Sequence, residues 1–146
     1  FYIHDIDKGK LKEADLRAKR AGVKFKRLEA KNLQKYCCSF DYIIADVPCS
    51  GSGAWRRNPQ QKWRITPESL NEILTRQTVI LDEAKDLLKK NGYIFYITCS
   101  LLKIENEEVI HKFLMENKHF RLFNKKNVTI DNHGDGFFCA VLEKKN

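Results

Sequence analysis

Apolar positions along the chain follow two kinds of spacing in turn, and this alternation predicts strands separated by helices. Short apolar runs are typical of strands, whereas the stretches between them repeat apolar residues every three or four positions, as one face of a helix does. Strands are expected at residues 1–3, 23–28, 42–45, 93–98, 120–123 and 137–142. Helices are expected at residues 11–21, 66–91 and 104–117, with a loop or short helix at 32–39 and a polar loop at 125–135. We therefore expect an α/β protein with a mostly parallel sheet, in which the last two strands form an antiparallel pair at one edge.

The longest predicted helix leads directly into the most apolar strand. Thr66 and Pro67 are typical of a helix start, with threonine as the cap and proline in the first turn. The apolar face that follows continues until the Asn-Gly pair at 91–92 ends it. Residues 93–98 are apolar almost throughout, which is typical of a strand buried on both faces of a parallel sheet. Cys99 therefore falls at the carboxyl end of that strand.

Composition indicates one globular, soluble domain with a polyanionic partner. The 146 residues are 42% apolar and 32% charged, enough for a single core. They contain no apolar run of about 20 residues that could span a membrane. The charged amino end has no signal-peptide pattern, which favours a cytoplasmic protein. The net charge of +8 and the pI near 9.3 favour RNA or another polyanion, although a basic surface without a partner explains the charge equally well.

Five cysteines, at positions 37, 38, 49, 99 and 139, indicate thiols in a reducing compartment. Their number is odd and no Cys-x-x-Cys pair occurs, which argues against a disulfide scaffold and a metal finger. We expect Cys37 and Cys38 to be partly buried structural residues and no metal to be bound. The metal alternative is a site built from these two cysteines and a histidine, but adjacent cysteines rarely chelate one ion well.

Residues 40–63 form the stretch around which we expect the function to be organised. A short apolar strand ends there at Asp46, Pro48 and Cys49, and in an open α/β sheet ligands bind at the carboxyl ends of the strands. The Ser-Gly-Ser-Gly run at 50–53 allows the backbone to turn and to approach a ligand closely. Cations beside an aromatic ring follow, which is a combination that suits a nucleic acid. These residues are Arg56, Arg57, Lys62, Trp63 and Arg64.

Two strands of the predicted sheet deliver a cysteine at the carboxyl end, namely Cys49 and Cys99. Because the carboxyl ends of parallel strands open on the same side of a sheet, both thiols are expected to face one cleft. A single cysteine in such a place is more often a buried structural residue. Two cysteines at equivalent strand ends favour a chemical role.

Three groups of motifs carry a resemblance to a known family. They are Asp46-Val47-Pro48-Cys49-Ser50 with Gly53, Arg56-Arg57-Asn58-Pro59 and Lys62-Trp63; Thr98-Cys99-Ser100 with Glu105-Asn106-Glu107; and Gly134-Asp135-Gly136-Phe137-Phe138. With these motifs in this order and spacing, the chain resembles the Sun/Fmu-type (NOL/NOP/Sun) RNA 5-methylcytosine methyltransferases over essentially its whole length. The resemblance implies an incomplete Rossmann-like methyltransferase fold, S-adenosylmethionine as the cofactor and RNA as the substrate, with ribosomal RNA favoured somewhat over transfer RNA.

The resemblance also implies a role for each residue at the strand ends. Cys99 would add to carbon 6 of a cytosine, which makes carbon 5 nucleophilic enough to accept a methyl group. Cys49 would help to remove the proton from carbon 5 and release the product. Asp46 would hold the ring near nitrogen 3 and favour the adduct as a general acid does. The target base has to leave any stack, and Arg56, Arg57, Lys62, Trp63 and Arg64 are expected to grip the flanking RNA.

Cofactor contacts are implied at Asp5, Asp46 and Pro48. Asp5 follows the first strand, where an acid accepts hydrogen bonds from ribose hydroxyls. An exposed turn or a helix cap is the structural alternative for this residue, and Asp7 is the better candidate for the cap.

The sequence departs from the family in two respects. The glycine-rich loop, the first strand with its helix and a catalytic lysine are expected before Phe1, and the adenine-side acid is replaced by Lys31 or Asn32. We therefore expect residues 1–146 to be the C-terminal part of a single methyltransferase catalytic domain. Its expected partner is the missing N-terminal part of the same protein, with no other obligate protein partner and no membrane.

Two further alternatives stay open at this point. The segment around Asp46 also resembles the Asp/Asn-Pro-Pro-aromatic motif of exocyclic-amine methyltransferases, but Cys49 stands where an aromatic residue should stack on the base. The second alternative is that the chain is a non-catalytic RNA-binding fragment or the product of a decayed methyltransferase gene.

Overall fold

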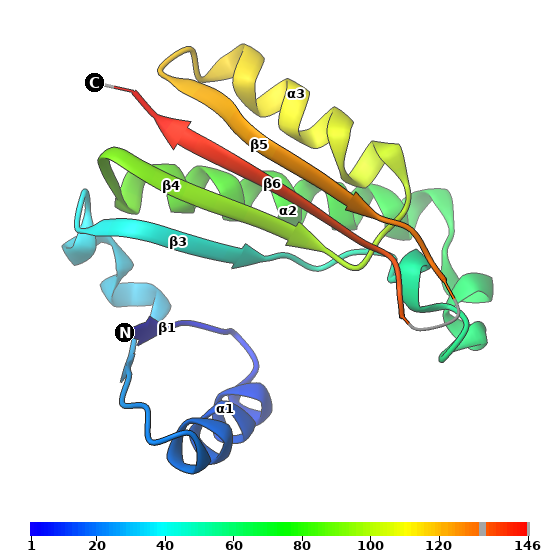
Figure 1. Ribbon diagram of the computed structural model, residues 1–146, viewed down its shortest axis with the longest axis horizontal. Coiled ribbons are helices and arrows are strands. Elements are labelled where there is room, and N and C mark those ends of the chain that lie inside the picture. The colour runs from blue at the N-terminus through cyan, green and yellow to red at the C-terminus, as the bar shows by residue number, and fades with distance from the viewer. Residues whose placement is uncertain (132–133, 146) are drawn as a thin grey trace. The chain divides into compact units, whose positions relative to one another are not determined.

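The computed structural model describes residues 1–131 and 134–145, and the chain divides into two compact units (Figure 1). The first unit comprises Phe1–Cys37 and the second comprises Cys38–Asn146. Each unit has its own sheet, with two strands in the first and four in the second. Within the described residues, no helix is both long and apolar enough to cross a lipid bilayer.

The first unit is a small parallel β-α-β arrangement. Its elements are β1 (Tyr2–Ile3), α1 (Lys8–Arg20), β2 (Lys26–Arg27) and the 3-10 helix η1 (Ala30–Tyr36). Asp7 caps α1 as predicted, because its carboxylate accepts hydrogen bonds from the backbone of Gly9 and Lys10. The strand predicted at 23–28 is wrong in extent, since only two residues pair. Their side chains are both charged and exposed, so no buried face extends the strand.

The second unit is a four-stranded mixed sheet in the order β3-β4-β6-β5. Its elements are β3 (Phe40–Asp46), α2 (Pro67–Leu87), β4 (Leu88–Thr98), α3 (Glu107–Glu116), β5 (Phe120–Val128) and β6 (Phe137–Lys144), with 3-10 helices η2 (Ser52–Ala54), η3 (Pro59–Arg64) and η4 (Lys103–Glu105). β3 and β4 are parallel, and β6 is antiparallel to β4 and to β5. The predicted antiparallel pair at one edge is therefore confirmed.

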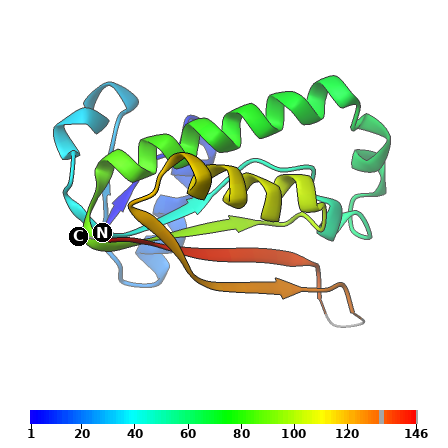
Figure 2. The ribbon, with the colours of Figure 1, turned by 90° about the horizontal axis from the view of Figure 1, so that it is seen from above.

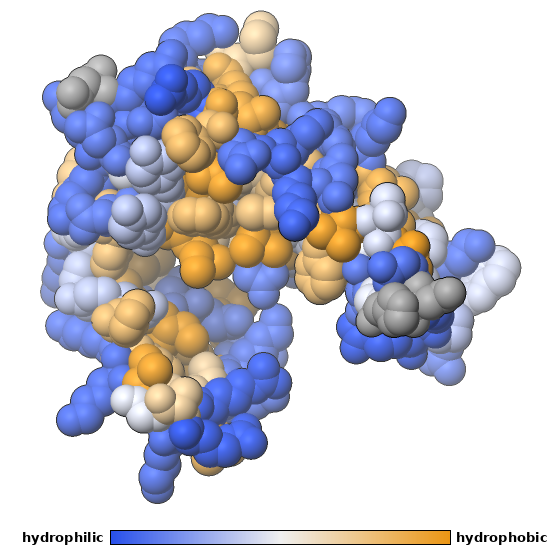
Figure 3. All heavy atoms as spheres, in the orientation of Figure 1, coloured by the Kyte–Doolittle hydropathy of each residue, from blue (hydrophilic) through white to orange (hydrophobic). Residues whose placement is uncertain are grey.

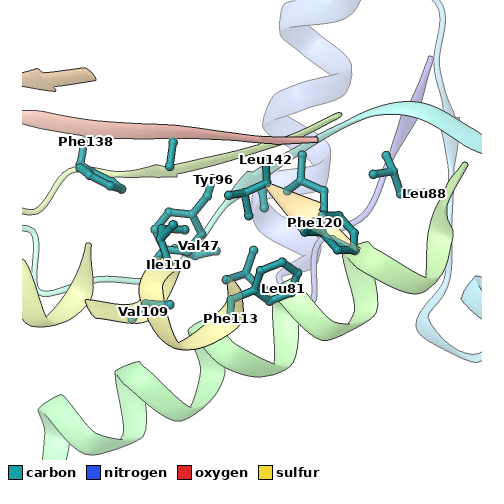
Figure 4. Close-up of a cluster of buried hydrophobic side chains, with 14 residues drawn as sticks. Val47, Leu81, Leu88, Tyr96, Val109, Ile110, Phe113, Phe120, Phe138 and Leu142 are labelled. Atoms are coloured by element: carbon teal, nitrogen blue, oxygen red, sulfur yellow. The ribbon is translucent and has the colours of Figure 1, made fainter. Parts of the chain in front are cut away.

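The core of the second unit lies between the sheet and its two helices, which cover the same face (Figure 2). Alternate residues of β4 point into this core, and Tyr96 and Ile94 have no exposed surface. They meet Leu81 from α2 and Phe113 from α3, as Figure 4 shows for three of these side chains. Tyr96 also contacts the ring of Phe138 edge-to-face, with ring centroids 6.2 Å apart. β4, which leads into Cys99, and its two neighbours β3 and β6 thus share one core.

The opposite face of this sheet carries apolar side chains that stay accessible (Figure 3). Tyr42 and Ile44 of the edge strand β3 are 68% and 72% exposed. The ring of Tyr42 stacks on Tyr93, and Tyr93 meets Phe123 edge-to-face. An aromatic row therefore crosses the sheet on the side away from α2 and α3.

Three predicted boundaries are wrong, each for a local reason. The long helix ends at Leu87 because Leu88 is already extended and fully buried, and the positive φ of Asn91 falls in an irregular part of β4. The strand predicted at 120–123 continues to Val128, since an edge strand bonds through its backbone and needs no apolar alternation. The helix predicted from residue 104 begins at Glu107, after η4.

The predicted burial of Cys37 and Cys38 is also wrong. Both cysteines are exposed, at the surface turn that joins η1 to β3. Cys38 has a positive φ of 50°, and its backbone amide donates to the carbonyl oxygen of Asp86 at 3.0 Å. The thiol of Cys38 donates to the same carbonyl oxygen at 3.9 Å, so hydrogen bonds to Asp86 hold the turn although both side chains are exposed.

Replacing Leu81 with alanine should destabilise the second unit by about 2–5 kcal/mol, because it leaves a cavity in the core between the sheet and both helices. Leu81 is 1% exposed. Val79→Ala on the same helix, where the side chain is 49% exposed, is the matched control and should change the unfolding free energy far less. Urea unfolding followed by circular dichroism measures both. Equal losses for the two variants would contradict this account of the core.

Candidate active site

Two parallel strands bring Cys49 and Cys99 together at one edge of the sheet. Asp46, the last residue of β3, is in register with Ile97 of β4, and the amide of Val47 donates to the carbonyl of Ile97 at 3.2 Å. The loops that follow both strands leave the sheet side by side. The Sγ atoms of Cys49 and Cys99 are consequently 3.3 Å apart, within hydrogen-bonding distance, and both side chains are half-buried.

The two thiols share a proton unequally. The hydrogen bond from the Cys49 thiol lowers the pKa of Cys99 to about 7, against the opposing effect of burial. The same hydrogen bond, followed by burial, raises the pKa of Cys49 far above its usual range. As the pH rises above about 7 the pair therefore comes to carry one negative charge, which resides mainly on Cys99. A thiolate is the nucleophilic form of cysteine, so Cys99 is the activated member of the pair.

A buried carboxylate lies directly behind the two cysteines. Glu105, in η4, has no exposed surface. One of its oxygens accepts a hydrogen bond from the backbone amide of Ser50 at 2.6 Å. The other accepts from the hydroxyls of Ser50, at 2.5 Å, and of Ser100. Glu105 thus bonds to the residue that follows each cysteine.

The η4 segment is itself anchored to β4. The hydroxyl of Tyr96 donates to the carbonyl of Glu105 at 2.6 Å. The next residue, Asn106, accepts from the hydroxyl of Thr98 at 2.7 Å and donates to the carbonyl of Ser100 at 2.9 Å. All of these groups are buried, where such hydrogen bonds are costly to break. The position of the Glu105 carboxylate is therefore set by the strand that carries Cys99.

The loop after β3 is held from two other sides. The buried side chain of Gln77 on α2 donates to the carbonyl of Pro48 at 2.9 Å. The indole of Trp55 donates to the carbonyl of Ser50 at 3.2 Å. The residues on both sides of Cys49 are thereby fixed through their backbone.

Backbone contacts also connect this loop to the Cys99 loop and to the segment before β6. The amide of Gly53 donates to the carbonyl of Cys99 at 2.9 Å, and the amide of Gly136 donates to the carbonyl of Gly53 at 3.0 Å. A Cβ atom on Gly53 would lie 2.2 Å from the carbonyl oxygen of Gly136. Only glycine permits this close approach of the three segments.

The five residues predicted to bind RNA are all exposed, two in the loop between η2 and η3 and three on η3. Two of them also make contacts inside the protein. Arg57 pairs with Asp135, which raises the pKa of the guanidinium, and Arg56 donates to the carbonyl of Asp131 at 3.2 Å. Lys62 lies over the ring of Trp63, 5.7 Å from its centroid, and the Trp63 side chain is 83% exposed.

Of the residues predicted to contact the cofactor, Asp46 and Pro48 are exposed at the end of β3, beside the cysteines. Asp5 lies in the first unit, directly after β1 and half-buried. Its carboxylate accepts from the amide of Asp7 at 2.7 Å and lies 4.0 Å from the amine of Lys10. Among residues 1–131 and 134–145, no three His, Cys, Asp or Glu side chains are grouped so as to hold a metal ion.

Comparison with known proteins identifies the family. A family described as 16S rRNA methyltransferase RsmB/F matches residues 2–143. The chain belongs to this family. The resemblance inferred from the motifs is thereby confirmed.

Curated relatives of the RsmB/F family share about a third of their residues with this chain. Ribosomal RNA small subunit methyltransferase B of Serratia proteamaculans is 33% identical, over 96% of this chain and 35% of the relative. The protein of the same name from Escherichia coli O1:K1 / APEC is 35% identical, over 97% of this chain and 36% of the relative. The chain therefore spans about a third of the length of these relatives.

Solved structures confirm the fold class. The structure of the protein PH0851 has a TM-score of 0.89 at 32% identity, over 98% of this chain and 36% of that chain. A methyltransferase homolog from Pyrococcus horikoshii has a TM-score of 0.79 at 27% identity, over 98% of this chain and 52% of that chain. The RsmB/F chain has the Rossmann-like fold of S-adenosylmethionine-dependent methyltransferases, and its sheet is incomplete relative to these solved chains.

Sequence reasoning gave no role to the carboxylate behind the cysteines of this RsmB/F protein. Glu105 was expected in the first turn of a helix, where an acid faces solvent and interacts with the helix dipole. It precedes the helix instead and is buried. The signal that could have identified it is the Glu-Asn-Glu run shortly after Thr-Cys-Ser, because three serines precede it on the two cysteine loops.

Alkylation of Cys99 by iodoacetamide should rise with pH, with a midpoint near pH 7, because only the thiolate reacts. In Cys49→Ala the hydrogen-bond donor is gone, so the midpoint should move up toward the usual thiol range of about 8.5. Mass spectrometry of the Cys99 peptide measures both. Cys139, whose pKa burial raises, is an internal control that should react only at higher pH. An unchanged midpoint in Cys49→Ala would contradict the shared proton.

Proposed function

We propose that this protein methylates carbon 5 of a cytosine in ribosomal RNA, with S-adenosylmethionine as the methyl donor and a covalent cysteine adduct as the intermediate. The observation that carries the proposal is the pair of thiols, 3.3 Å apart at the ends of two parallel strands. Membership of the RsmB/F family supports the rRNA substrate. Because the chain spans about a third of its relatives, we assign the activity to the full-length protein.

Cytosine carbon 5 is a poor nucleophile, so the reaction needs prior activation of the ring. In the proposed mechanism the sulfur of Cys99 forms a bond to carbon 6, and the electron pair of the 5,6 double bond becomes available at carbon 5. Cys99 suits this step because its thiolate form prevails at and above about pH 7. Asp46 is exposed beside the pair and carries out the implied role of holding the ring near nitrogen 3.

Cys49 acts second, because it gives up its proton more readily once Cys99 is no longer a thiolate. The hydrogen bond to Cys99 and repulsion by its charge are among the causes that raise the pKa of Cys49. Once the sulfur of Cys99 is bonded to carbon 6, it is neutral and both causes are removed. After carbon 5 has received the methyl group, Cys49 can lose its own proton to solvent and take the proton from carbon 5, and the Cys99–carbon 6 bond breaks as Cys99 leaves as a thiolate. In this mechanism the attack by Cys99 must therefore precede proton removal by Cys49.

Each unit carries residues proposed to contact the cofactor. In the first unit, Asp5 follows a parallel strand, and its carboxylate would accept hydrogen bonds from ribose hydroxyls. In the second unit, Asp46 and Pro48 are exposed at the strand end next to the thiols. When bound, S-adenosylmethionine supplies an electrophilic methyl group. Within residues 1–146 we assign no lysine and no glycine-rich loop to cofactor binding, because both are expected before Phe1.

Covalent trapping tests the proposal. RNA containing 5-fluorocytosine has no proton to lose from carbon 5, so full-length enzyme with S-adenosylmethionine should form an adduct that survives a denaturing gel. Cys99→Ala should form none. On ordinary RNA, Cys49→Ala should release its adduct about 10²–10⁴-fold more slowly than the wild type. An exocyclic-amine methyltransferase needs no enzyme thiolate, so methylation without any adduct would overturn the proposal.

We propose that η3 contacts RNA in two ways, with Arg64 binding a phosphate and Trp63 stacking on a base. Arg64→Ala should lower the salt dependence of RNA binding by about 0.7 in the slope of log K against log salt, because one phosphate contact is lost. Trp63→Ala should weaken binding by about 1–3 kcal/mol with the slope unchanged, because a stacking face is lost. Fluorescence anisotropy at several salt concentrations measures both. Wild-type affinity and slope in both variants would exclude this segment from the RNA interface.

A further inference from the structure

We infer that Glu105 is a positioning residue. It bridges the loops that carry Cys49 and Cys99 and thereby holds the two thiols within hydrogen-bonding distance of each other. The hydrogen bonds of its carboxylate go to serines and not to either sulfur. It acts through Ser50 and Ser100, each the residue that follows a cysteine. For its catalytic consequence alone, this inference rests on the proposed function.

The groups that face the Glu105 side chain are all donors. The amide of Ser50 has only a proton to offer. The hydroxyl oxygen of Ser50 also accepts from the amide of Ser52 at 3.3 Å, and that of Ser100 accepts from the amide of Leu102 at 3.0 Å. Their hydroxyl protons are therefore directed to the carboxylate. Only an acceptor at both oxygens satisfies this arrangement, and an ionised carboxylate is the side chain that provides it.

A third hydroxyl closes the network between the loops. Ser52 lies 3.0 Å from the hydroxyl oxygen of Ser100 and accepts from the amide of Leu101 at 2.8 Å. The hydroxyl oxygens of Ser50 and Ser100 are 3.3 Å apart. Three serines from two loops thus gather around one carboxylate, with side chains that are buried throughout. Such a network is rigid when satisfied and costly when one acceptor is lost.

Glutamine at position 105 is the discriminating change, because it keeps the shape and replaces one acceptor by a donor. In Glu105→Gln an amide NH₂ would face either a backbone amide, which can only donate, or two hydroxyls that each already accept from a backbone amide. We expect the two loops to separate and the thiols with them. Glu108→Gln, on the exposed side of α3, is the matched control.

The distance between the thiols can be measured without catalysis, in the full-length protein. Phenylarsine oxide condenses with two neighbouring thiols, forming two arsenic–sulfur bonds and releasing one water, with no change of oxidation state. Its affinity for the pair should fall at least tenfold in Glu105→Gln and stay unchanged in Glu108→Gln. Binding that is lost in Cys49→Ser and Cys99→Ser is assigned to this pair.

A second readout separates positioning from general stability. In Glu105→Gln the alkylation midpoint of Cys99 should shift upward. Loss of the Cys49 donor, the largest cause acting on the pKa of Cys99, outweighs loss of the Glu105 charge, which raises that pKa in the wild type. Adducts with 5-fluorocytosine RNA should form more slowly. A folded Glu105→Gln variant with wild-type arsenical affinity and midpoint would overturn the inference. If this variant does not fold, Ser100→Ala, which removes one arm of the bridge, should show the same changes to a smaller degree, and wild-type behaviour there would overturn it equally. If wild-type protein forms no adduct while the arsenical results hold, the proposed function fails and the positioning role of Glu105 stands.

Discussion

The parallel pairing of β3 with β4 is the constraint on which the site depends. Because the two strands run in the same direction and in register, their carboxyl ends stop together, and the loops beyond them start from fixed points. A shift of one residue would turn the side chains of either strand to the opposite face of the sheet. The shared core with α2 and α3 holds this register, since alternate residues of β4 are fully buried. Precision at the thiols is thus produced by apolar packing some distance away.

The two thiols of the site differ in protonation although they belong to the same residue type. Both residues are cysteines, and both follow parallel strands, yet their thiols differ in how far they are enclosed and in which of them donates. Distinct properties arise without distinct residue types. No further acid or base is needed to make the two thiols differ, because each sulfur affects the protonation of the other.

The positions of the two cysteines could be predicted from the sequence, because apolar periodicity locates strand ends and parallel topology places such ends together. The role of Glu105 could not, since its spacing fits a helical turn and only the tertiary structure shows that η4 turns it inward. The sequence also failed to predict the polar second half of β5, because no apolar pattern marks it. An edge strand is defined by backbone hydrogen bonds to β6, which leave no periodic mark in a sequence such as Asn124 to Asn127.

The close contact between Gly53 and Gly136 joins remote parts of the chain mechanically. Two successive backbone hydrogen bonds run from the segment before β6, through Gly53, to the carbonyl of Cys99. Changes in the residues that lead into β6 can therefore reach the main chain of Cys99 through these two hydrogen bonds. Variation in this segment can tune reactivity from outside the chemical centre.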